Sequence, residues 1–290
     1  MTLATTVLAE GFVFTEGPRW HEGRLWCSDM HGHRVVAVDP DGTVEVVAVV
    51  DEDEPSGLGW LPDGRLLIVS MERQWLLRRE HDGTVVRHAD LSPLARGSLN
   101  DMIVAADGSA YVGDMGSRIH DGGPRQSGQT FLVRPDGSVE VAADDLQAPN
   151  GHVLTPDEAT LIVAESGGMR LTAFDRKVDG TLANKRTFAE LVPSDPVVRA
   201  SPPDGICLDA EGAVWAADPV GRRVLRVLAG GAVTDLVGFD QVPVACVLGG
   251  PERRTLYVCI APDWRRDALA GTRGGRIVAL PVTVPGAGKP

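Results

Sequence analysis

The sequence lacks the marks of several protein classes. It has no run of 18 apolar residues, so we expect no helix that spans a membrane. Its N-terminus has no basic segment followed by a long apolar stretch, so we expect no signal peptide. The net charge of −12 argues against nucleic acid as a partner, because phosphates attract clustered lysine and arginine.

Cysteines are few and none stands in a Cys-x-x-Cys pair. Their apolar surroundings predict buried free thiols rather than a disulfide framework. Without a signal peptide or disulfides, the sequence predicts a cytoplasmic protein. The four cysteines are Cys27, Cys207, Cys246 and Cys259.

One short phrase returns six times along the chain. It consists of a polar or small residue, usually a nearby glycine, and an apolar stretch that leads through a turn into an apolar strand. The repeats lie 40 to 54 residues apart, a period that is typical of repeat architectures. The phrases begin at Glu16, Ser56, Asn100, Asn150, Asp204 and Cys246.

These repeats predict an all-β fold, a six-bladed β-propeller of four-stranded blades that forms a single domain over residues 1–290. Short β-rich segments recur in every repeat, and none shows helical periodicity. The sixth repeat is short of one strand. We expect Leu3–Leu8 to supply that strand and to close the ring, which would protect an open sheet edge.

The connections differ between the two faces of the predicted propeller. Asp-Gly and Glu-Gly pairs, such as Asp63-Gly64 and Asp82-Gly83, predict tight hairpins on one face, the tight-turn face. Long polar loops lie on the other, the open face, where function is expected. One of these loops, residues 116–128, is a candidate lid because it is long and rich in glycine.

Equivalent positions in a closed array form a ring around the axis, and this ring contains Glu16, Asn100, Asn150 and Asp204. Two carboxylates and one amide carbonyl, from Glu16, Asp204 and Asn150, give oxygen donors with a charge of −2. This set predicts a divalent cation, Ca²⁺ first and Mg²⁺ or Mn²⁺ next. The ring has no histidine, so a dedicated Zn²⁺ site is less favoured, although Zn²⁺ stays an alternative. Three protein donors leave positions for water and substrate, as in a catalytic site.

A simpler interpretation is that these residues only form turns, because Asn-Gly and Asp-Gly are common turn pairs. Three matched ring positions together favour the cation. Clustered carboxylates would otherwise repel one another on the axis.

The chain resembles the family of regucalcin (senescence marker protein), gluconolactonase and luciferin-regenerating enzyme. The phrases that carry the resemblance are Thr15-Glu-Gly-Pro-Arg-Trp, Leu99-Asn-Asp-Met-Ile-Val, Ala148-Pro-Asn-Gly and Pro203-Asp-Gly-Ile-Cys-Leu. The resemblance implies a six-bladed propeller with one axial divalent cation and lactone hydrolysis as the activity. It implies that Glu16, Asn150 and Asp204 bind the cation and that Asp204 is also the general base. Asn100 matches the family's asparagine on the substrate side.

The chain departs from the family pattern at Ser98, where the members that act on sugar lactones have an arginine. Serine leaves space, so we expect a preference for less polar lactones in a more apolar pocket. The alternative is that Arg118 or Arg73 takes the place of the missing arginine. The residues expected to line the apolar pocket are Met71, Trp75, Met115, Ile119 and Trp264.

Several other polar residues are candidates for the substrate side, each with a structural alternative. Ser98 lies two residues before Asn100 and Asp101 directly follows it, and Asp101 is alternatively a solvated loop carboxylate. His152 follows Asn150 by two residues and is alternatively a packed histidine. Asp218 is either a pocket wall or a loop cap. His31 and His33 resemble metal ligands, but two ligands alone do not make a site.

The sequence therefore predicts a metal-dependent hydrolase of a lactone or related cyclic ester, with a small-molecule substrate. A metal-dependent lyase or isomerase on the same site is the first alternative. A non-enzymatic propeller that binds a ligand or protein is the second, because a fold does not fix a function. The sequence indicates no particular oligomeric state.

Overall fold

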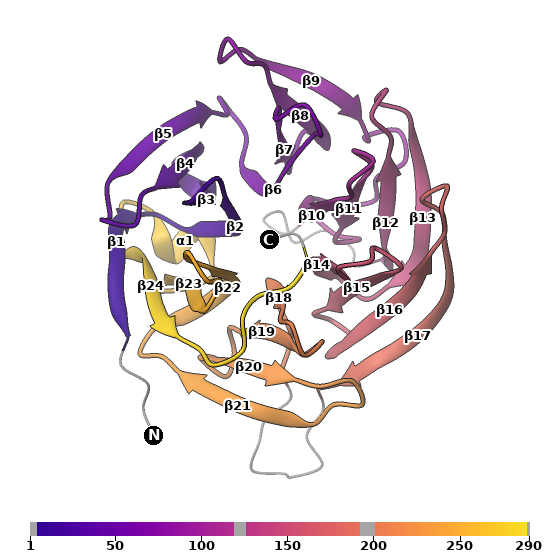
Figure 1. The fold of residues 1–290 in the computed structure, drawn as a ribbon. Coiled ribbons are helices and arrows are strands. Elements are labelled where there is room, and N and C mark those ends of the chain that lie inside the picture. Colours follow the sequence, from indigo (N-terminus) through magenta and orange to yellow (C-terminus); the bar gives the residue numbers. More distant parts are fainter. Residues whose placement is uncertain (1–4, 119–125, 192–200, 289–290) are drawn as a thin grey trace.

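The computed structural model describes residues 5–118, 126–191 and 201–288, which form six four-stranded antiparallel sheets around a central axis (Figure 1). The predicted six-bladed propeller is confirmed. The strands of blades one to three are β2 (Thr15–His21), β3 (Arg24–Asp29), β4 (Arg34–Val38), β5 (Val44–Val49), β6 (Pro55–Trp60), β7 (Leu66–Ser70), β8 (Trp75–Arg79), β9 (Val85–Asp90), β10 (Leu99–Val104), β11 (Ala110–Asp114), β12 (Gly128–Val133) and β13 (Val139–Leu146). Those of blades four to six are β14 (Pro149–Leu154), β15 (Thr160–Glu165), β16 (Arg170–Arg176), β17 (Leu182–Glu190), β18 (Ile206–Leu208), β19 (Val214–Asp218), β20 (Arg223–Val227), β21 (Val233–Gly238), β22 (Val242–Gly249), β23 (Thr255–Ala261), β24 (Gly275–Pro281) and β1 (Thr6–Phe12).

The N-terminal strand closes the ring, as predicted. β1 pairs with β24 and forms the outermost strand of blade six (Figure 1). It covers Thr6–Phe12 rather than the expected Leu3–Leu8, and residues 1–4 lie outside the described part. The strand extends further because Phe12 is 1% exposed and anchors its end in the core.

In the described ranges, helical structure is limited to two short turns in open-face loops, a 3-10 turn η1 (Met30–Gly32) and α1 (Arg266–Leu269). No helix within the described residues is long and apolar enough to cross a membrane.

The tight-turn face has the hairpins that the sequence predicts. Gly64 and Gly83 have φ angles of 86° and 91°, a conformation that glycine adopts without steric cost. Asp63 accepts a hydrogen bond from the backbone N–H of Arg65 (3.1 Å), which fixes the turn. The C-terminal segment also reaches this face, where the backbone N–H of Ala287 donates to Leu208 O at 2.9 Å.

Close packing of the first strands explains why a glycine follows most ring residues. A Cβ atom at Gly57 would lie 2.5 Å from the backbone nitrogen of Met102 in the next blade. One at Gly151 would lie 2.6 Å from the backbone nitrogen of Ile206. Any side chain at these positions would push two inner strands apart.

A β-bulge in the first strand accompanies the ring position in five blades. In blade one the pairing of β2 with β3 shifts between Glu16 and Arg19, and β6, β10, β14 and β22 show the same irregularity. A bulge changes the direction of a side chain, so it offers a backbone reason for the ring residues to turn toward the axis.

The same register corrects the prediction for blade six. Val242 pairs with the last residue of β23 just as Thr15 pairs with the last residue of β3. The residue equivalent to Glu16 is therefore Pro243, and Cys246 lies three residues further along the strand. The apolar stretch around Cys246 contains no polar marker that would fix the phase of the sixth repeat.

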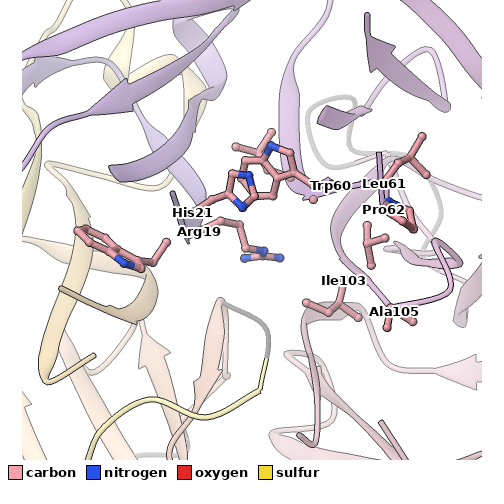
Figure 2. A pocket seen from close by; sticks show the side chains of 12 residues that line it. Arg19, His21, Trp60, Leu61, Pro62, Ile103 and Ala105 are labelled. Atoms are coloured by element: carbon pink, nitrogen blue, oxygen red, sulfur yellow. The ribbon is translucent and has the colours of Figure 1, made fainter. Parts of the chain in front are cut away.

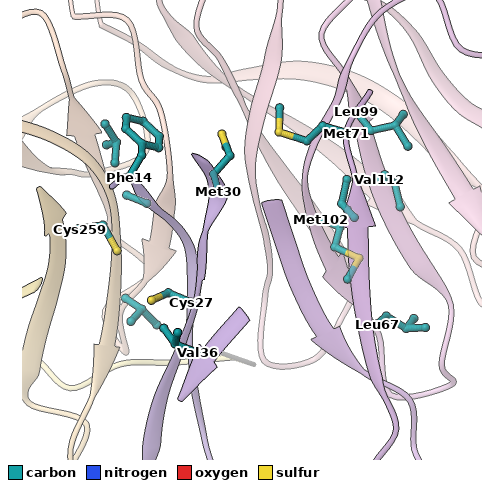
Figure 3. Close-up of a cluster of buried hydrophobic side chains, with 14 of the residues drawn as sticks. Phe14, Cys27, Met30, Val36, Leu67, Met71, Leu99, Met102, Val112 and Cys259 are labelled. Atoms are coloured by element: carbon teal, nitrogen blue, oxygen red, sulfur yellow. The ribbon is translucent and has the colours of Figure 1, made fainter. Parts of the chain in front are cut away.

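Apolar side chains fill the space between the blades. Figure 3 shows part of the largest cluster, where Phe14, Met30 and Leu99 pack close to the open face. All four cysteines are buried and free, which confirms the prediction. Cys27 and Cys259 belong to this cluster, and Cys207 and Cys246 lie in another with their sulfur atoms 3.8 Å apart.

Carboxylates at the end of the second strand hold the open-face loops of several blades. Asp218 Oδ1 accepts the backbone N–H of Gly221 (2.8 Å), and Oδ2 accepts Nε of Arg223 (2.8 Å). Asp29 does the same with Arg34 and also accepts the backbone N–H groups of Val13 and Phe14. Of the two alternatives for Asp218, the contacts correspond to the loop cap.

Gly57→Ala should lower the free energy of unfolding by about 3 kcal/mol, because the new methyl group meets backbone that cannot move aside. Thermal or urea unfolding measures the effect. Gly238→Ala is the matched control, since nothing lies within 4 Å of its Cβ position. Equal stability of the two variants would contradict the packing argument.

Asp218→Ala should also destabilise the fold by about 3 kcal/mol, because it removes the carboxylate from a mostly buried arginine. Arg223 is 14% exposed and Asp218 1%. Asp235→Ala, at a side chain that is 51% exposed, should change stability by less than about 0.5 kcal/mol. If urea unfolding shows no difference between the two variants, Asp218 does not hold the loop.

Candidate functional site

The ring residues enter the structure at equivalent places in their blades. Glu16 is the second residue of β2, and Asn100 and Asn150 hold the same position in β10 and β14. Asp204 lies two residues before β18. Glu16, Asn100 and Asn150 are buried, with exposed fractions of 5–7%, and Asp204 is partly buried.

Asn150 and Asp204 are in direct contact. The Asn150 side chain forms a hydrogen bond with the Asp204 carboxylate, and the backbone N–H of Gly151 donates to Asp204 O at 3.2 Å. Ser166 joins them, because its hydroxyl donates to Pro203 O (2.6 Å) and lies 3.4 Å from the Asn150 amide nitrogen. These contacts fix the Asn150 amide beside the carboxylate.

Glu16 and Asp204 influence each other through their charges. Burial, and then the charges of Asp204 and Asp101, raise the pKa of Glu16 well above its ordinary value. Burial also raises the pKa of Asp204 to about 7, against the hydrogen bond from Asn150, which lowers it. The groups that shift these two pKa values include no arginine, lysine or histidine. Among the described residues, Glu16 and Asp204 therefore have no basic partner that would stabilise their ionised forms.

This donor set fits a hard divalent cation. Glu16, Asp204 and Asn150 offer carboxylate and amide oxygens, the ligands that Ca²⁺ and Mg²⁺ prefer. Within residues 5–118, 126–191 and 201–288, no three His, Cys, Asp or Glu side chains form a group suited to a metal. A site here would therefore use two carboxylates and the Asn150 amide.

Asn100 is held from the neighbouring blade. Ser56 Oγ donates to Asn100 Oδ1 (2.9 Å), and Ser28 Oγ donates to the backbone oxygen of Ser56 (2.6 Å). The Asn100 amide nitrogen lies 3.7 Å from the sulfur of Met115. Ser56 and Met115 thus set the orientation of the Asn100 amide.

Asp101 is not a solvated loop carboxylate. It is 5% exposed and pairs with Arg19 of blade one at 2.8 Å. His152 is packed between blades three and four, 1% exposed, with Nε2 at 3.1 Å from Thr130 Oγ1. Burial lowers the pKa of His152 to about 4, so its imidazole is neutral at pH 7.

Ser98 belongs to a polar cluster on the open face. It is fully buried, and its hydroxyl donates to Glu72 Oε1 at 2.5 Å. Arg118 Nη1 donates to both the backbone oxygen and Oε2 of Glu72, at 2.7 and 2.8 Å. Of the two candidate arginines, Arg118 is therefore the one linked to Ser98, whereas Arg73 pairs with Glu52.

The residues expected to form an apolar pocket differ in how far they are buried. Met71 is 1% exposed within the core, and Trp75 lies on the third strand of its blade beneath the Arg87 guanidinium. Met115 contacts Asn100, and Trp264 is 58% exposed. Ile119 lies outside the described residues, as does most of the candidate lid.

His31 and His33 bind carboxylate and backbone oxygens rather than each other. His31 Nδ1 lies 2.9 Å from Glu54 Oε1, and His33 Nδ1 lies 2.7 Å from Asp53 O. Glu54 is 2% exposed and also pairs with Arg266 of blade six at 3.3 Å. Glu54, Glu72 and Arg19 were not predicted as site residues, because none of them begins a repeated phrase.

Comparison with known proteins gives consistent similarities along nearly the whole chain. The SMP-30/Gluconolactonase/LRE-like region matches residues 14–261. Regucalcin of Xenopus laevis is 27% identical over 272 residues, 90% of this chain and 89% of that protein. Pentonolactonase XacC of Haloferax volcanii is 30% identical over 286 residues, 93% of this chain and 91% of that protein.

A solved structure of a gluconolactonase from Xanthomonas campestris superposes with a TM-score of 0.74 at 26% identity, covering 97% of this chain and 89% of that one. The match to the family region covers well over half of the chain, and it includes every ring residue. The protein therefore belongs to the SMP-30/gluconolactonase/LRE-like family.

Proposed function

We propose that the protein hydrolyses a lactone with the help of one divalent cation on the propeller axis. The observation that carries this proposal is the pair of carboxylates Glu16 and Asp204. Neither forms an ion pair with a basic side chain among the described residues. Relatives named as a pentonolactonase and a gluconolactonase support lactone hydrolysis as the reaction.

Glu16, Asn150 and Asp204 would hold the cation through oxygen atoms. Their charge of −2 matches a divalent ion, with Ca²⁺ as the first choice and Mg²⁺, Mn²⁺ or Zn²⁺ as alternatives. When bound, such an ion would polarise the lactone carbonyl and lower the pKa of water.

The chain's own residues would bind the substrate and transfer the proton. Asp204 is the proposed general base, because it is a carboxylate on the axis that can take the proton from the attacking water. The water oxygen adds to the carbonyl carbon, the ring C–O bond breaks, and the released alkoxide takes up a proton to give a hydroxy acid. Asn100, whose amide is fixed by Ser56, is the proposed contact to the lactone.

The cluster around Ser98 suggests the kind of lactone. Arg118 supplies hydrogen-bond donors, and its partner Glu72 supplies acceptors, so together they suit hydroxyl groups rather than an apolar ring. Met71 lies beside Leu99, but its side chain is buried in the core, and Trp75 lies beneath the Arg87 guanidinium. We therefore favour a hydroxylated lactone over the less polar substrate that Ser98 alone suggests.

The wild-type protein should melt at a higher temperature in Ca²⁺ than in EDTA. A cation at a hundredfold excess over its Kd adds about 2.7 kcal/mol to the free energy of unfolding. Asp204→Asn keeps the shape of the side chain but removes one charge, so it should lose most of this stabilisation and most of the turnover. Identical melting of the wild type with and without Ca²⁺, together with no heat of binding in calorimetry, would contradict the cation site. Undiminished turnover in the variant with the ion still bound would rule out the base role.

The kcat/KM for gluconolactone should exceed that for dihydrocoumarin by more than about tenfold. Arg118→Ala should reduce the value for gluconolactone while leaving that for dihydrocoumarin nearly unchanged, and Arg73→Ala is the matched control. A preference for dihydrocoumarin in the wild type would instead support the apolar pocket.

A further inference from the structure

One buried ion pair crosses the channel just beyond the ring. Arg19 on β2 of blade one and Asp101 on β10 of blade three are 82 residues apart, and their charged atoms lie 2.8 Å apart. Their side chains are 5% and 7% exposed. Figure 2 shows the Arg19 guanidinium directed toward the centre of the propeller.

The pair is fixed in place by the surrounding backbone. Arg19 donates to the backbone oxygens of Pro18 and Met102, and Asp101 Oδ1 accepts the backbone N–H of Met102 at 2.8 Å. Arg19 also borders a cavity of about 270 Å³ that lies toward the tight-turn face (Figure 2). The pair thus lies between this cavity and the ring residues.

Asp101 is close enough to the ring for its charge to affect the ring carboxylates. It directly follows Asn100, and its negative charge contributes to the raised pKa of both Glu16 and Asp204. When the ring carboxylates are ionised, as cation binding requires, a free Asp101 would bring the charge on the axis to −3. With Arg19, the two ring carboxylates alone remain uncompensated.

We propose that Arg19 sets the net charge of the cation site, by neutralising Asp101 and by holding its carboxylate away from the ring. This proposal rests on the cation site proposed above. A site at −2 balances a divalent ion, whereas a third free carboxylate would bind the ion more tightly and take a position needed by water or substrate. Arg19 and Asp101 are positioning residues in this account, because they form a buried ion pair and act on the site through their charges.

A purely structural role for the pair makes a different prediction. If Arg19 and Asp101 only tie blades one and three together, removing either charge should weaken the site or leave it unchanged. If they set its charge, the two single changes should alter cation affinity in opposite directions. The sign of the effect therefore separates the two roles.

The test is calorimetric titration of the full chain with Ca²⁺ at about 0.15 M salt. Arg19→Gln keeps a donor against Asp101 and removes only the charge, so it should tighten Ca²⁺ binding about tenfold. Asp101→Asn leaves Arg19 uncompensated and should weaken binding by a similar factor. The double variant Arg19→Met/Asp101→Asn, which removes both charges, should return to within about threefold of the wild type.

Arg24→Gln is the matched control, because it also removes one positive charge. Arg24 pairs with Asp39 and Glu45 on blade one away from the ring, so its loss should leave Ca²⁺ affinity unchanged. Unchanged or weaker binding by Arg19→Gln, while the wild type binds Ca²⁺, would overturn the inference and leave the proposed function intact. If the wild type itself binds no Ca²⁺, the proposed function fails and the inference fails with it.

Discussion

The structure depends on how closely its six inner strands approach one another around the axis. Gly57 and Gly151 lie against backbone atoms of the next blade, where no Cβ atom fits. The same segments contain β-bulges beside the ring residues. Close approach and bulges together bring polar residues from distant parts of the chain to a common point. The glycines and the functional residues are therefore neighbours in the sequence for a mechanical reason.

This convergence creates an electrostatic problem. Glu16 and Asp204 are brought together in a largely buried place, and Asp101 adds a third charge nearby. Arg19 neutralises Asp101, whereas the part of the chain that the structure describes offers no such partner to the other two. Elsewhere in the molecule, buried carboxylates such as Asp29 and Asp218 have an arginine five residues later in the chain. Burial and mutual repulsion therefore raise the pKa of both ring carboxylates, and the proposed cation would stabilise their ionised forms.

Much of this was predictable from the sequence because it is periodic. The repeated phrase predicted six blades, the Asp-Gly pairs predicted the tight-turn face, and the short sixth repeat predicted closure by the N-terminal strand. The ring position of blade six was assigned wrongly, because the apolar strand around Cys246 has no polar residue to fix its phase, and the register places Pro243 there. The Arg19–Asp101 pair was not predictable. It joins two strands 82 residues apart, and a bulge in β2 breaks the alternation that would say where Arg19 points. The contact between Ser98, Glu72 and Arg118 likewise depends on how loops from two blades meet.

The most direct test of the central claim is a crystal structure of the protein grown with Ca²⁺, with anomalous scattering used to locate the ion. The account predicts one strong peak on the axis, with oxygen atoms of Glu16, Asn150 and Asp204 at about 2.3–2.6 Å from it. It also predicts that Asp101 remains paired with Arg19 and does not bind the ion. A well-ordered ring without a peak, or a peak bound by other residues, would contradict the account.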